Sequence, residues 1–177
     1  MKVLKFGGKS LSAGAGNPLQ GALDIMSSEA RKGKILVVCS ARGKTTDMLE
    51  DMLEKAARGE DYMPSYMYFC ERQQAPDVEM DMSSEFAEMR QMLEGVALLG
   101  EYSLKIKDRF MSFGEILSCK MVAHLLSKRG FKTRFVDSRR LIKTTDEWGS
   151  ASVIMDVSRK NVEEFFADAQ EDVIEVV

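Results

Sequence analysis

The chain has 177 residues, with 25 lysines and arginines against 28 aspartates and glutamates, which gives a formal net charge of −3. Its 45% apolar content is enough to bury a core, and its length fits one domain or part of a larger one. The slight acidic excess argues against binding to nucleic acid or to an anionic membrane surface. No apolar run reaches the ~18 residues that span a bilayer, and the three cysteines lack the spacing of a zinc site. We therefore expect a soluble protein of the reducing cytoplasm, with no nucleic-acid or membrane partner.

The first sixty residues alternate between β-prone runs and helical patterns. Residues 2–6 form a β-prone run that stops at a pair of glycines, and residues 35–39 (ILVVC) form the continuous apolar run of a strand buried on both faces. The spacing of apolar residues predicts helices over residues 18–33 and 47–59. This alternation predicts an α/β fold, in which a mainly parallel sheet lies between layers of helices.

The rest of the chain begins with a long helical region. Residues 64–130 are mostly helical in pattern, with breaks near Pro76 and Gly100, and we expect the longest helix there to cover Ile116–Lys128. Beyond it the pattern predicts a strand, a helix and a second strand, over residues 131–136, 156–169 and 172–177. Because the chain stops inside an apolar β-prone run, we interpret it as part of a domain with a truncated sheet.

The turn after the first strand is the first candidate site. It reads KFGGKS over residues 5–10, and its two glycines let the backbone pass close to a ligand and turn consecutive N–H groups toward it. Lys5 adds a positive charge, so the turn suits a phosphate. The alternative is an ordinary strand-to-loop turn with solvated lysines. Neither GK pair of the chain completes a P-loop, because Val3 and Val38 stand where that motif needs glycine.

Two further stretches carry chemistry. The polar loop Ser40–Thr46 (SARGKTT) follows the second strand, where ligands collect in open α/β sheets. Thr45 or Thr46 can instead cap the next helix, and the two roles can coexist. Glu115, in Ser-Phe-Gly-Glu, lies where a helix dipole favours a carboxylate, so a structural role is the default. The glycine before it also allows a ligand's ammonium group to approach. His124, the single histidine, lies in an apolar stretch that is typical of a core or near-surface histidine rather than a base.

Four stretches in this order resemble the amino-terminal part of the aspartate kinases, in the amino-acid kinase family. They are VLKFGGKS (Val3–Ser10), VVCSARGKTTDML (Val37–Leu49), LLGEYSLKIKDRFMSFGEILS (Leu98–Ser118) and FVDSRRLIKTTDEWGSA (Phe135–Ala151). The first and third are the most specific to that family, and four ordered motifs at compatible spacing are stronger evidence than any one of them. The resemblance extends over nearly the whole chain, and residues 61–84 contribute least.

The resemblance implies a fold and a reaction. The fold is an α/β three-layer sandwich with a mainly parallel sheet, like that of carbamate kinase. Residues 1–177 would form the N-terminal part of one kinase domain, without its nucleotide-binding half or any regulatory domain. The reaction transfers the γ-phosphoryl group of ATP to the side-chain carboxylate of L-aspartate, with Mg²⁺ bound through the nucleotide. It is the first step toward lysine, threonine and methionine, and full-length members commonly form homo-oligomers.

The resemblance also implies seven site residues and no metal ligand of the protein's own. Lys5 would contact the transferring phosphate, and the phosphate and nucleotide turn would consist of Lys5, Gly7, Gly8 and Ser10. The substrate-binding residues would be Ser40, Thr46 and Glu115, the last receiving the α-ammonium group. The family usually has threonine or serine where this chain has Lys9. Because half of the charge-stabilising groups are missing, we expect the chain alone to have negligible kinase activity.

Two alternatives remain open at the level of sequence. The first is another member of the same family, acting on glutamate, carbamate or a nucleoside monophosphate. The second is a binding or regulatory module that kept the fold and lost the chemistry, for which Lys9 and the abrupt end of the chain are the support.

Overall fold

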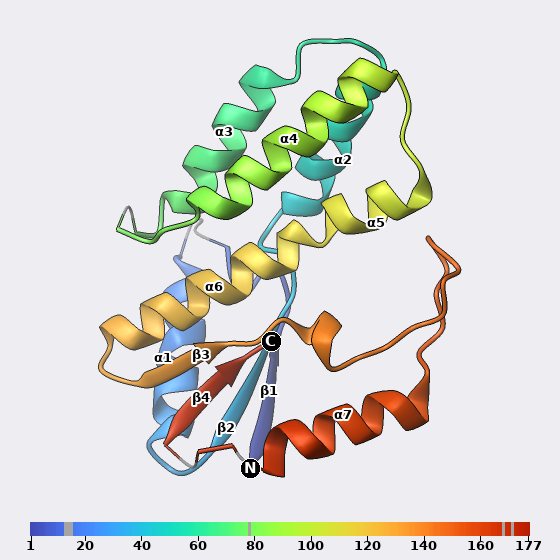
Figure 1. Ribbon diagram of the computed structural model, residues 1–177. Helices are drawn as coiled ribbons and strands as arrows, with labels where there is room; N and C mark the ends of the chain where they lie inside the picture. The colour runs from blue at the N-terminus through green and yellow to red at the C-terminus, as the bar shows by residue number, and fades with distance from the viewer. Residues whose placement is uncertain (13–15, 78, 168, 171) are drawn as a thin grey trace.

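The computed structural model describes residues 1–12, 16–77, 79–167, 169–170 and 172–177. In this part of the chain the strands are β1 (Lys2–Phe6), β2 (Ile35–Cys39), β3 (Lys132–Phe135) and β4 (Val173–Val176). The α-helices are α1 (Pro18–Ala30), α2 (Thr45–Ala57), α3 (Met63–Gln74), α4 (Ser83–Leu99), α5 (Leu104–Met111), α6 (Phe113–Lys128) and α7 (Met155–Ala167). Figure 1 shows the strands side by side in the lower half of the molecule and the helices α2 to α5 above them.

The four strands form one parallel sheet in the order β1-β2-β4-β3. β1 and β2 pair in register from Lys2 with Ile35 to Phe6 with Cys39, and β4 lies between β2 and β3. The expected α/β class and the mainly parallel sheet are therefore confirmed. Because all four strands run in one direction, their carboxyl ends meet at one edge of the sheet, where parallel sheets bind ligands.

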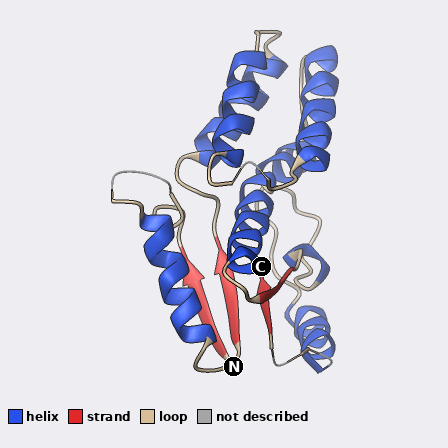
Figure 2. Cartoon of the chain, turned by 90° about the vertical axis from the view of Figure 1, so that its left-hand side faces the viewer, coloured by secondary structure: helices blue, strands red, loops and turns tan. Residues whose placement is uncertain are grey.

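Helices lie on both faces of the sheet, as the three-layer expectation requires. Figure 2 shows α1 on one side of the strands and α7 on the other. The face that α1 and α6 cover is mostly apolar, and its buried strand residues are Phe6, Ile35, Val37, Cys39, Ile174 and Val176. On the opposite face the Arg134 guanidinium lies 4.7 Å from the Phe165 ring of α7. The β1 end of that face is open, since Val3 is 56% exposed.

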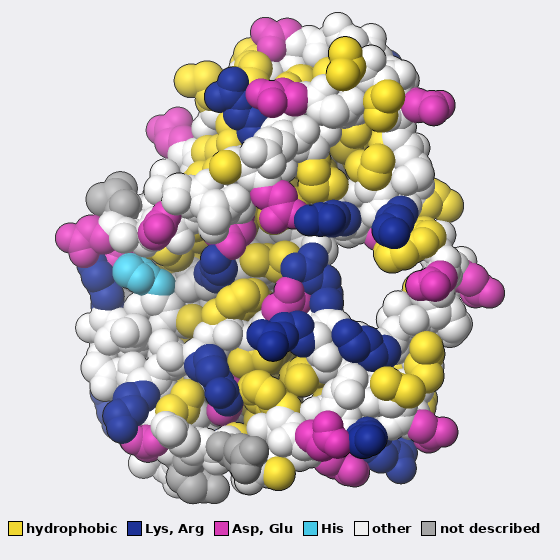
Figure 3. All heavy atoms as spheres, in the orientation of Figure 1, with side chains coloured by type: hydrophobic (Ala, Val, Ile, Leu, Met, Phe, Trp, Pro, Cys, Tyr) yellow, Lys and Arg dark blue, Asp and Glu magenta, His cyan; other side chains and the backbone are white. Residues whose placement is uncertain are grey.

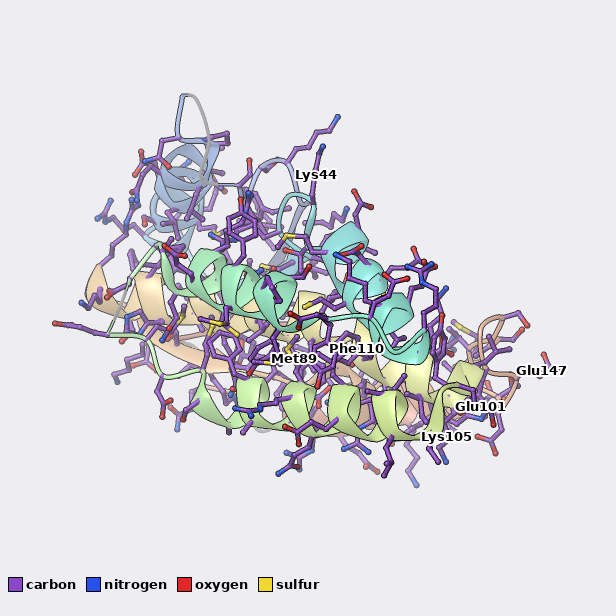
Figure 4. All side chains as sticks on the ribbon, turned by 90° about the horizontal axis from the view of Figure 1, so that it is seen from above. Lys44, Met89, Glu101, Lys105, Phe110 and Glu147 are labelled. Atoms are coloured by element: carbon purple, nitrogen blue, oxygen red, sulfur yellow. The ribbon has the colours of Figure 1, made fainter. Side chains whose placement is uncertain are left out.

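The helices α2 to α5 form a second layer beyond the carboxyl edge of the sheet (Figure 1). Its interior is mostly apolar, and Met89 of α4 and Phe110 of α5 are fully buried in it, between α3 and α4 (Figure 4). In the described part of the chain, none of the helices has both the length and the apolar character needed to cross a membrane. Because helices α2 to α5 lie beyond the carboxyl edge of the sheet, the loops that follow β1 and β2 lie between the sheet and these helices.

Several helix limits differ from the sequence-based prediction. α2 begins at Thr45, two residues early, and α6 begins at Phe113 rather than Ile116. The longest helix of the central region is α4, with 17 residues, and not α6, with 16. The pattern missed the division at Ser112, because that residue keeps helical backbone angles (φ −62°, ψ −17°) and only the direction of the chain changes. The predicted helix over residues 156–169 ends at Ala167, and residue 168 lies outside the described residues.

The carboxylate of Glu29 ties the end of α1 to β1. It accepts hydrogen bonds from the ammonium groups of Lys2 and, at 2.6 Å, Lys32. These contacts, with Lys2 first, lower the pKa of Glu29 from 4.5 to about 2. A carboxyl whose pKa is lower in the folded state stabilises the fold above its unfolded pKa. That contribution disappears as the pH falls through the folded value.

We predict that Glu29→Gln lowers the urea midpoint of unfolding at about pH 7, and that most of this difference from the unsubstituted chain is lost by about pH 2. Urea titrations at a series of pH values measure this directly. Glu163→Gln, on the exposed side of α7, is the matched control and should leave the midpoint unchanged throughout. A Glu29→Gln difference as large at about pH 2 as at about pH 7 would contradict the assigned ion pairs.

Candidate active site

The Gly7–Gly8 turn and the loop after β2 are packed backbone to backbone. The N–H of Gly43 donates to the carbonyl of Gly8 across 2.8 Å. A Cβ atom at position 8 would lie only 2.2 Å from the carbonyl oxygen of Ala41, so glycine is required there. A Cβ atom at position 7 would have one neighbour within 4 Å, the Lys5 Nζ at 3.8 Å. The close approach to Ala41 therefore requires glycine at position 8, whereas position 7 has room for a Cβ atom.

The turn also leaves a row of backbone N–H groups unused. The N–H of Ser10 donates to the carbonyl of Gly7 across 3.0 Å, which closes the turn. Within the described residues, the N–H groups of Gly7, Gly8 and Lys9 donate to no backbone carbonyl. Lys5 is exposed, with its ammonium nitrogen beside Gly7. Successive free N–H groups next to an ammonium form the kind of concavity that binds phosphate.

Glu115 reaches the same corner from the first turn of α6. Its Oε1 accepts a hydrogen bond of 3.2 Å from the N–H of Ala41, whose carbonyl faces Gly8. A single residue of backbone therefore separates the Glu115 carboxylate from the glycine turn. The side chain is exposed, and its second oxygen accepts no hydrogen bond from the described residues. That oxygen is available to a cationic ligand.

Gly114 has a packing role that the sequence did not indicate. A Cβ atom at this position would lie 2.8 Å from the Cβ of Ala41 and 3.3 Å from the Cγ2 of Thr45. The expectation that this glycine opens a path for a ligand's ammonium group is therefore wrong. Gly114 instead lets α6 lie directly against the loop after β2, which brings Glu115 to Ala41.

Buried hydrogen bonds hold the loop after β2 to α3 and α6. Arg42, only 6% exposed, donates from its backbone N–H to Ser118 Oγ (2.9 Å) and from its guanidinium to Gln73 Oε1 (3.3 Å). Gln73 Nε2 donates to Thr45 Oγ1 (3.0 Å), and this hydroxyl donates to the carbonyl of Arg42 (2.5 Å). Burial, with a further contribution from the charge of Arg72, lowers the pKa of Arg42 to about 10. The sequence pattern did not indicate this network, because Gln73 comes from a separate helix.

The three predicted hydroxyl residues lie around this corner without being fixed by it. Ser40 is half-buried, and its N–H donates to the carbonyl of Phe6 across 3.1 Å. Thr46 is exposed in the first turn of α2, and Ser10 is exposed at the end of the glycine turn. Among the described residues no side chain caps α2, whose N-cap residue is Lys44. The capping role weighed for Thr45 and Thr46 is therefore not observed.

Glu115 also lines a cavity of about 240 Å³ at the carboxyl ends of β2, β3 and β4. Of the seven predicted site residues it is the only one that does so. Asp137 and Arg139, which follow β3, line the same cavity. The Arg139 guanidinium forks onto the Asp137 carboxylate through Nε (2.9 Å) and Nη2 (2.6 Å), and its Nη1 donates to Ser112 Oγ (3.1 Å). Sequence reasoning missed this pair, although its position just after a parallel strand was a usable signal.

A larger hollow of about 780 Å³ adjoins this cavity and shares Ser112, Ser138 and Arg139 with it. It lies between α5 and the segment that joins β3 to α7, and Figure 3 shows basic side chains around it. Trp148 belongs to that segment, and the Lys105 ammonium lies 5.2 Å from the centre of its ring. His124 lies elsewhere, half-buried on α6, with Nε2 3.1 Å from Asp77 Oδ2.

Comparison with known proteins identifies the group to which these features belong. The model of the amino acid kinase family matches residues 1–176. The chain belongs to the amino acid kinase family. Among curated members, aspartokinase 3, chloroplastic, of Arabidopsis thaliana is 35% identical over 162 residues, which cover 86% of this chain and 28% of that protein. The aspartokinase of Schizosaccharomyces pombe is 26% identical over 166 residues, 82% of this chain and 31% of that protein.

Solved structures of the same family share the fold. E. coli aspartokinase III in complex with aspartate and ADP superposes on 99% of this chain and 40% of its own, with a TM-score of 0.81 and 22% identity. The aspartate kinase of Clostridium acetobutylicum gives a TM-score of 0.76 at 20% identity. The chain thus spans 28–31% of these curated relatives and 38–40% of these solved chains. It has the amino acid kinase fold over that part.

The contact between the glycine turn and Ala41 predicts opposite outcomes for two adjacent substitutions. We expect Gly8→Ala to destabilise this amino acid kinase fold by about 1–3 kcal/mol, because the added Cβ overlaps backbone atoms that have no room to move. Gly7→Ala is the matched control and should change stability by less than about 0.5 kcal/mol. Chemical denaturation of both variants measures the difference, and equal effects would refute the contact.

Gly114 and Gly95 form a second pair, both inside helices. Gly114→Ala should destabilise the protein, because overpacking costs about 1–3 kcal/mol. Gly95→Ala should stabilise it by about 0.5–1 kcal/mol, because position 95 has nothing within 4 Å of the new Cβ and alanine is the better helix former. Thermal unfolding followed by circular dichroism gives both signs. Stabilisation by Gly114→Ala would show that α6 does not need its close approach to the loop.

Proposed function

We propose that this chain is the N-terminal part of the kinase domain of an aspartate kinase, which transfers the γ-phosphoryl group of ATP to the side-chain carboxylate of L-aspartate. The similarity to aspartokinases of plants and fungi supports this assignment, as does the fold that the chain shares with aspartokinase III. Because the chain spans less than half of these proteins, residues outside it would complete the nucleotide site and any regulatory domains.

The observation that carries the proposal is the position of Ala41. Its carbonyl faces Gly8, in the turn that suits a phosphate, and its N–H binds Glu115, which suits an ammonium group. A phosphate and an amino acid bound at these two places would be neighbours. Phosphoryl transfer depends mainly on such positioning and on neutralising charge, because both reactants are anions.

The chain's own residues have distinct tasks in this reaction. The aspartate carboxylate is already ionised at neutral pH, so it attacks the γ-phosphorus without a base. The bond from that phosphorus to the bridging oxygen breaks, and ADP leaves with the electron pair. Lys5 and the free N–H groups of Gly7 and Gly8 would stabilise the charge on the moving phosphoryl group. Glu115 would hold the α-ammonium by a charge-assisted hydrogen bond, while Ser40 and Thr46 offer hydroxyls to the remaining polar atoms.

The nucleotide would bring its own Mg²⁺. In the described residues, no three His, Cys, Asp or Glu side chains are grouped closely enough to hold a metal ion. The glycine turn and Lys5 fit the phosphates of ATP, since free N–H groups and an ammonium complement oxyanions. Mg²⁺ supplies neutralisation of the charge on the outer phosphates when it is bound with the nucleotide.

We further propose a cytoplasmic location for the protein. Cys39, Cys70 and Cys119 are all free thiols. Cys39 and Cys119 are buried side by side, close enough for a hydrogen bond between their thiol groups. Two adjacent thiols that remain unlinked fit a reducing compartment. A homo-oligomer of the full-length protein is proposed on the family resemblance alone.

Binding of L-aspartate to the chain tests the proposed function. We expect calorimetry to detect binding of L-aspartate and weaker binding of L-glutamate. Glu115→Gln should weaken L-aspartate binding by about tenfold, because a hydrogen bond between charged groups is worth about 1.5–3 kcal/mol. Glu101→Gln is the matched control, since Glu101 is exposed at the end of the helical layer far from Lys44 (Figure 4). It should leave the affinity unchanged.

Two outcomes would contradict the assignment to aspartate. Preferential binding of L-glutamate, carbamate or a nucleoside monophosphate would indicate another member of the family. Equal affinities of the Glu115→Gln and Glu101→Gln variants for L-aspartate would show that Glu115 does not receive the ammonium group.

A further inference from the structure

Five cations belong to the three segments that meet here, the glycine turn, the loop after β2 and the end of α3. They are Lys5, Lys9, Arg42, Lys44 and Arg72. In the described part of the chain none of them forms an ion pair, although lysines and arginines elsewhere are commonly paired, such as Lys107 with Glu50 and Arg109 with Glu88. Like charges that lack a carboxylate partner repel one another, and an anion between them removes that repulsion.

Arg72 is the member of this group that comes from outside the two loops. It lies in the last turn of α3, and its Nη2 is 4.0 Å from the position of a Cβ on Gly43. The same position is 3.7 Å from the Cβ of Ser12, and the N–H of Gly43 donates to the carbonyl of Gly8. The guanidinium of Arg72 therefore faces the corner where the glycine turn meets the second loop.

Neighbouring side chains hold Arg72 in this orientation. Its Nη1 donates to the hydroxyl of Tyr68 across 3.3 Å, and its guanidinium carbon lies 5.9 Å from the centre of the Tyr68 ring. Within the described residues, Nε and Nη2 donate to no acceptor. The side chain is thus oriented from one side, and its remaining donors are free for a ligand.

Arg42 lies close to Arg72, and within the described residues neither arginine forms an ion pair. The Arg42 guanidinium donates to the carbonyl of Arg72 as well as to Gln73. Burial lowers the pKa of Arg42, and the charge of Arg72 lowers it further. The two positive charges repel each other, and a polyanion bound at the corner would be attracted to both.

We propose that Arg72 is a further phosphate-binding residue, which reaches from α3 to the polyphosphate held at the Gly7–Gly8 turn. The proposal rests on the proposed function, because it takes the triphosphate of ATP as the anion. It adds a residue from α3 to a site otherwise built from the glycine turn. An arginine there recognises two phosphate oxygens at once, which a lysine does not.

Calorimetric titration of the chain with inorganic tripolyphosphate, at low ionic strength, tests this role without requiring catalysis. Arg72→Gln should weaken binding by about tenfold, the effect of losing a hydrogen bond between charged groups. The affinity of Arg72→Lys should lie between that of Arg72→Gln and that of the unsubstituted chain. Arg31→Gln is a matched control, because Arg31 is also exposed, lacks an ion pair in the described residues and lies 5.6 Å from an aromatic ring, that of Phe131. It should bind as the unsubstituted chain does.

A thermal melt of each variant separates binding from folding. Weaker binding by Arg72→Gln with an unchanged melting temperature supports the proposal. Unchanged tripolyphosphate affinity in Arg72→Gln, or an equal loss in Arg31→Gln, overturns it. So does the absence of any tripolyphosphate binding to the unsubstituted chain. The L-aspartate titration with Glu115→Gln judges the proposed function separately, so either proposal can fail while the other stands.

Discussion

The contact between the backbone of Gly8 and the carbonyl of Ala41 is the constraint on which the rest of the site depends. A side chain at position 8 would separate the turn after β1 from the loop after β2. The loop after β2 also places the N–H of Ala41 against the Glu115 carboxylate. The contact between Gly8 and Ala41 therefore sets the distance between the phosphate-binding turn and Glu115 in the proposed site. Backbone atoms pack at fixed distances and do not adjust as side chains do, which makes this a rigid reference point for both ligands.

The helical layer above the sheet has a part in this site as well as in the core. Through Gln73 it fixes Thr45 and Arg42, while Ser118 of α6, outside this layer, fixes the backbone of Arg42 from the other side. These are buried polar contacts in which each group has a partner, and such networks favour one arrangement of a loop over others. Contacts from the β1 side, from α3 and from α6 therefore determine the conformation of the loop, and this conformation sets the positions of its exposed hydroxyl groups.

Local patterns predicted most elements because each reports a local cause. The runs at 2–6 and 35–39 gave both strands with correct limits, since alternation and continuous apolarity follow directly from burial in a sheet. The limits of α2 and α6 were less accurate. Thr45 and Phe113 begin their helices early, because packing of Gly114 against Ala41 and Thr45 brings these two helix starts together. Such a contact between distant segments leaves no periodic signal in the sequence.

The sequence by itself determined the α/β class, the glycine turn and the family, because ordered motifs and residue periods are properties of single segments. Only the tertiary structure decided which glycines are required, which carboxylate reaches Ala41, and that Asp137 pairs with Arg139 beside Glu115. It also brought Arg72 from α3 to the corner near Gly43. The physical reason is that close approach and charge proximity are set by how whole helices and loops pack, and segments that are separate along the chain share no local signal.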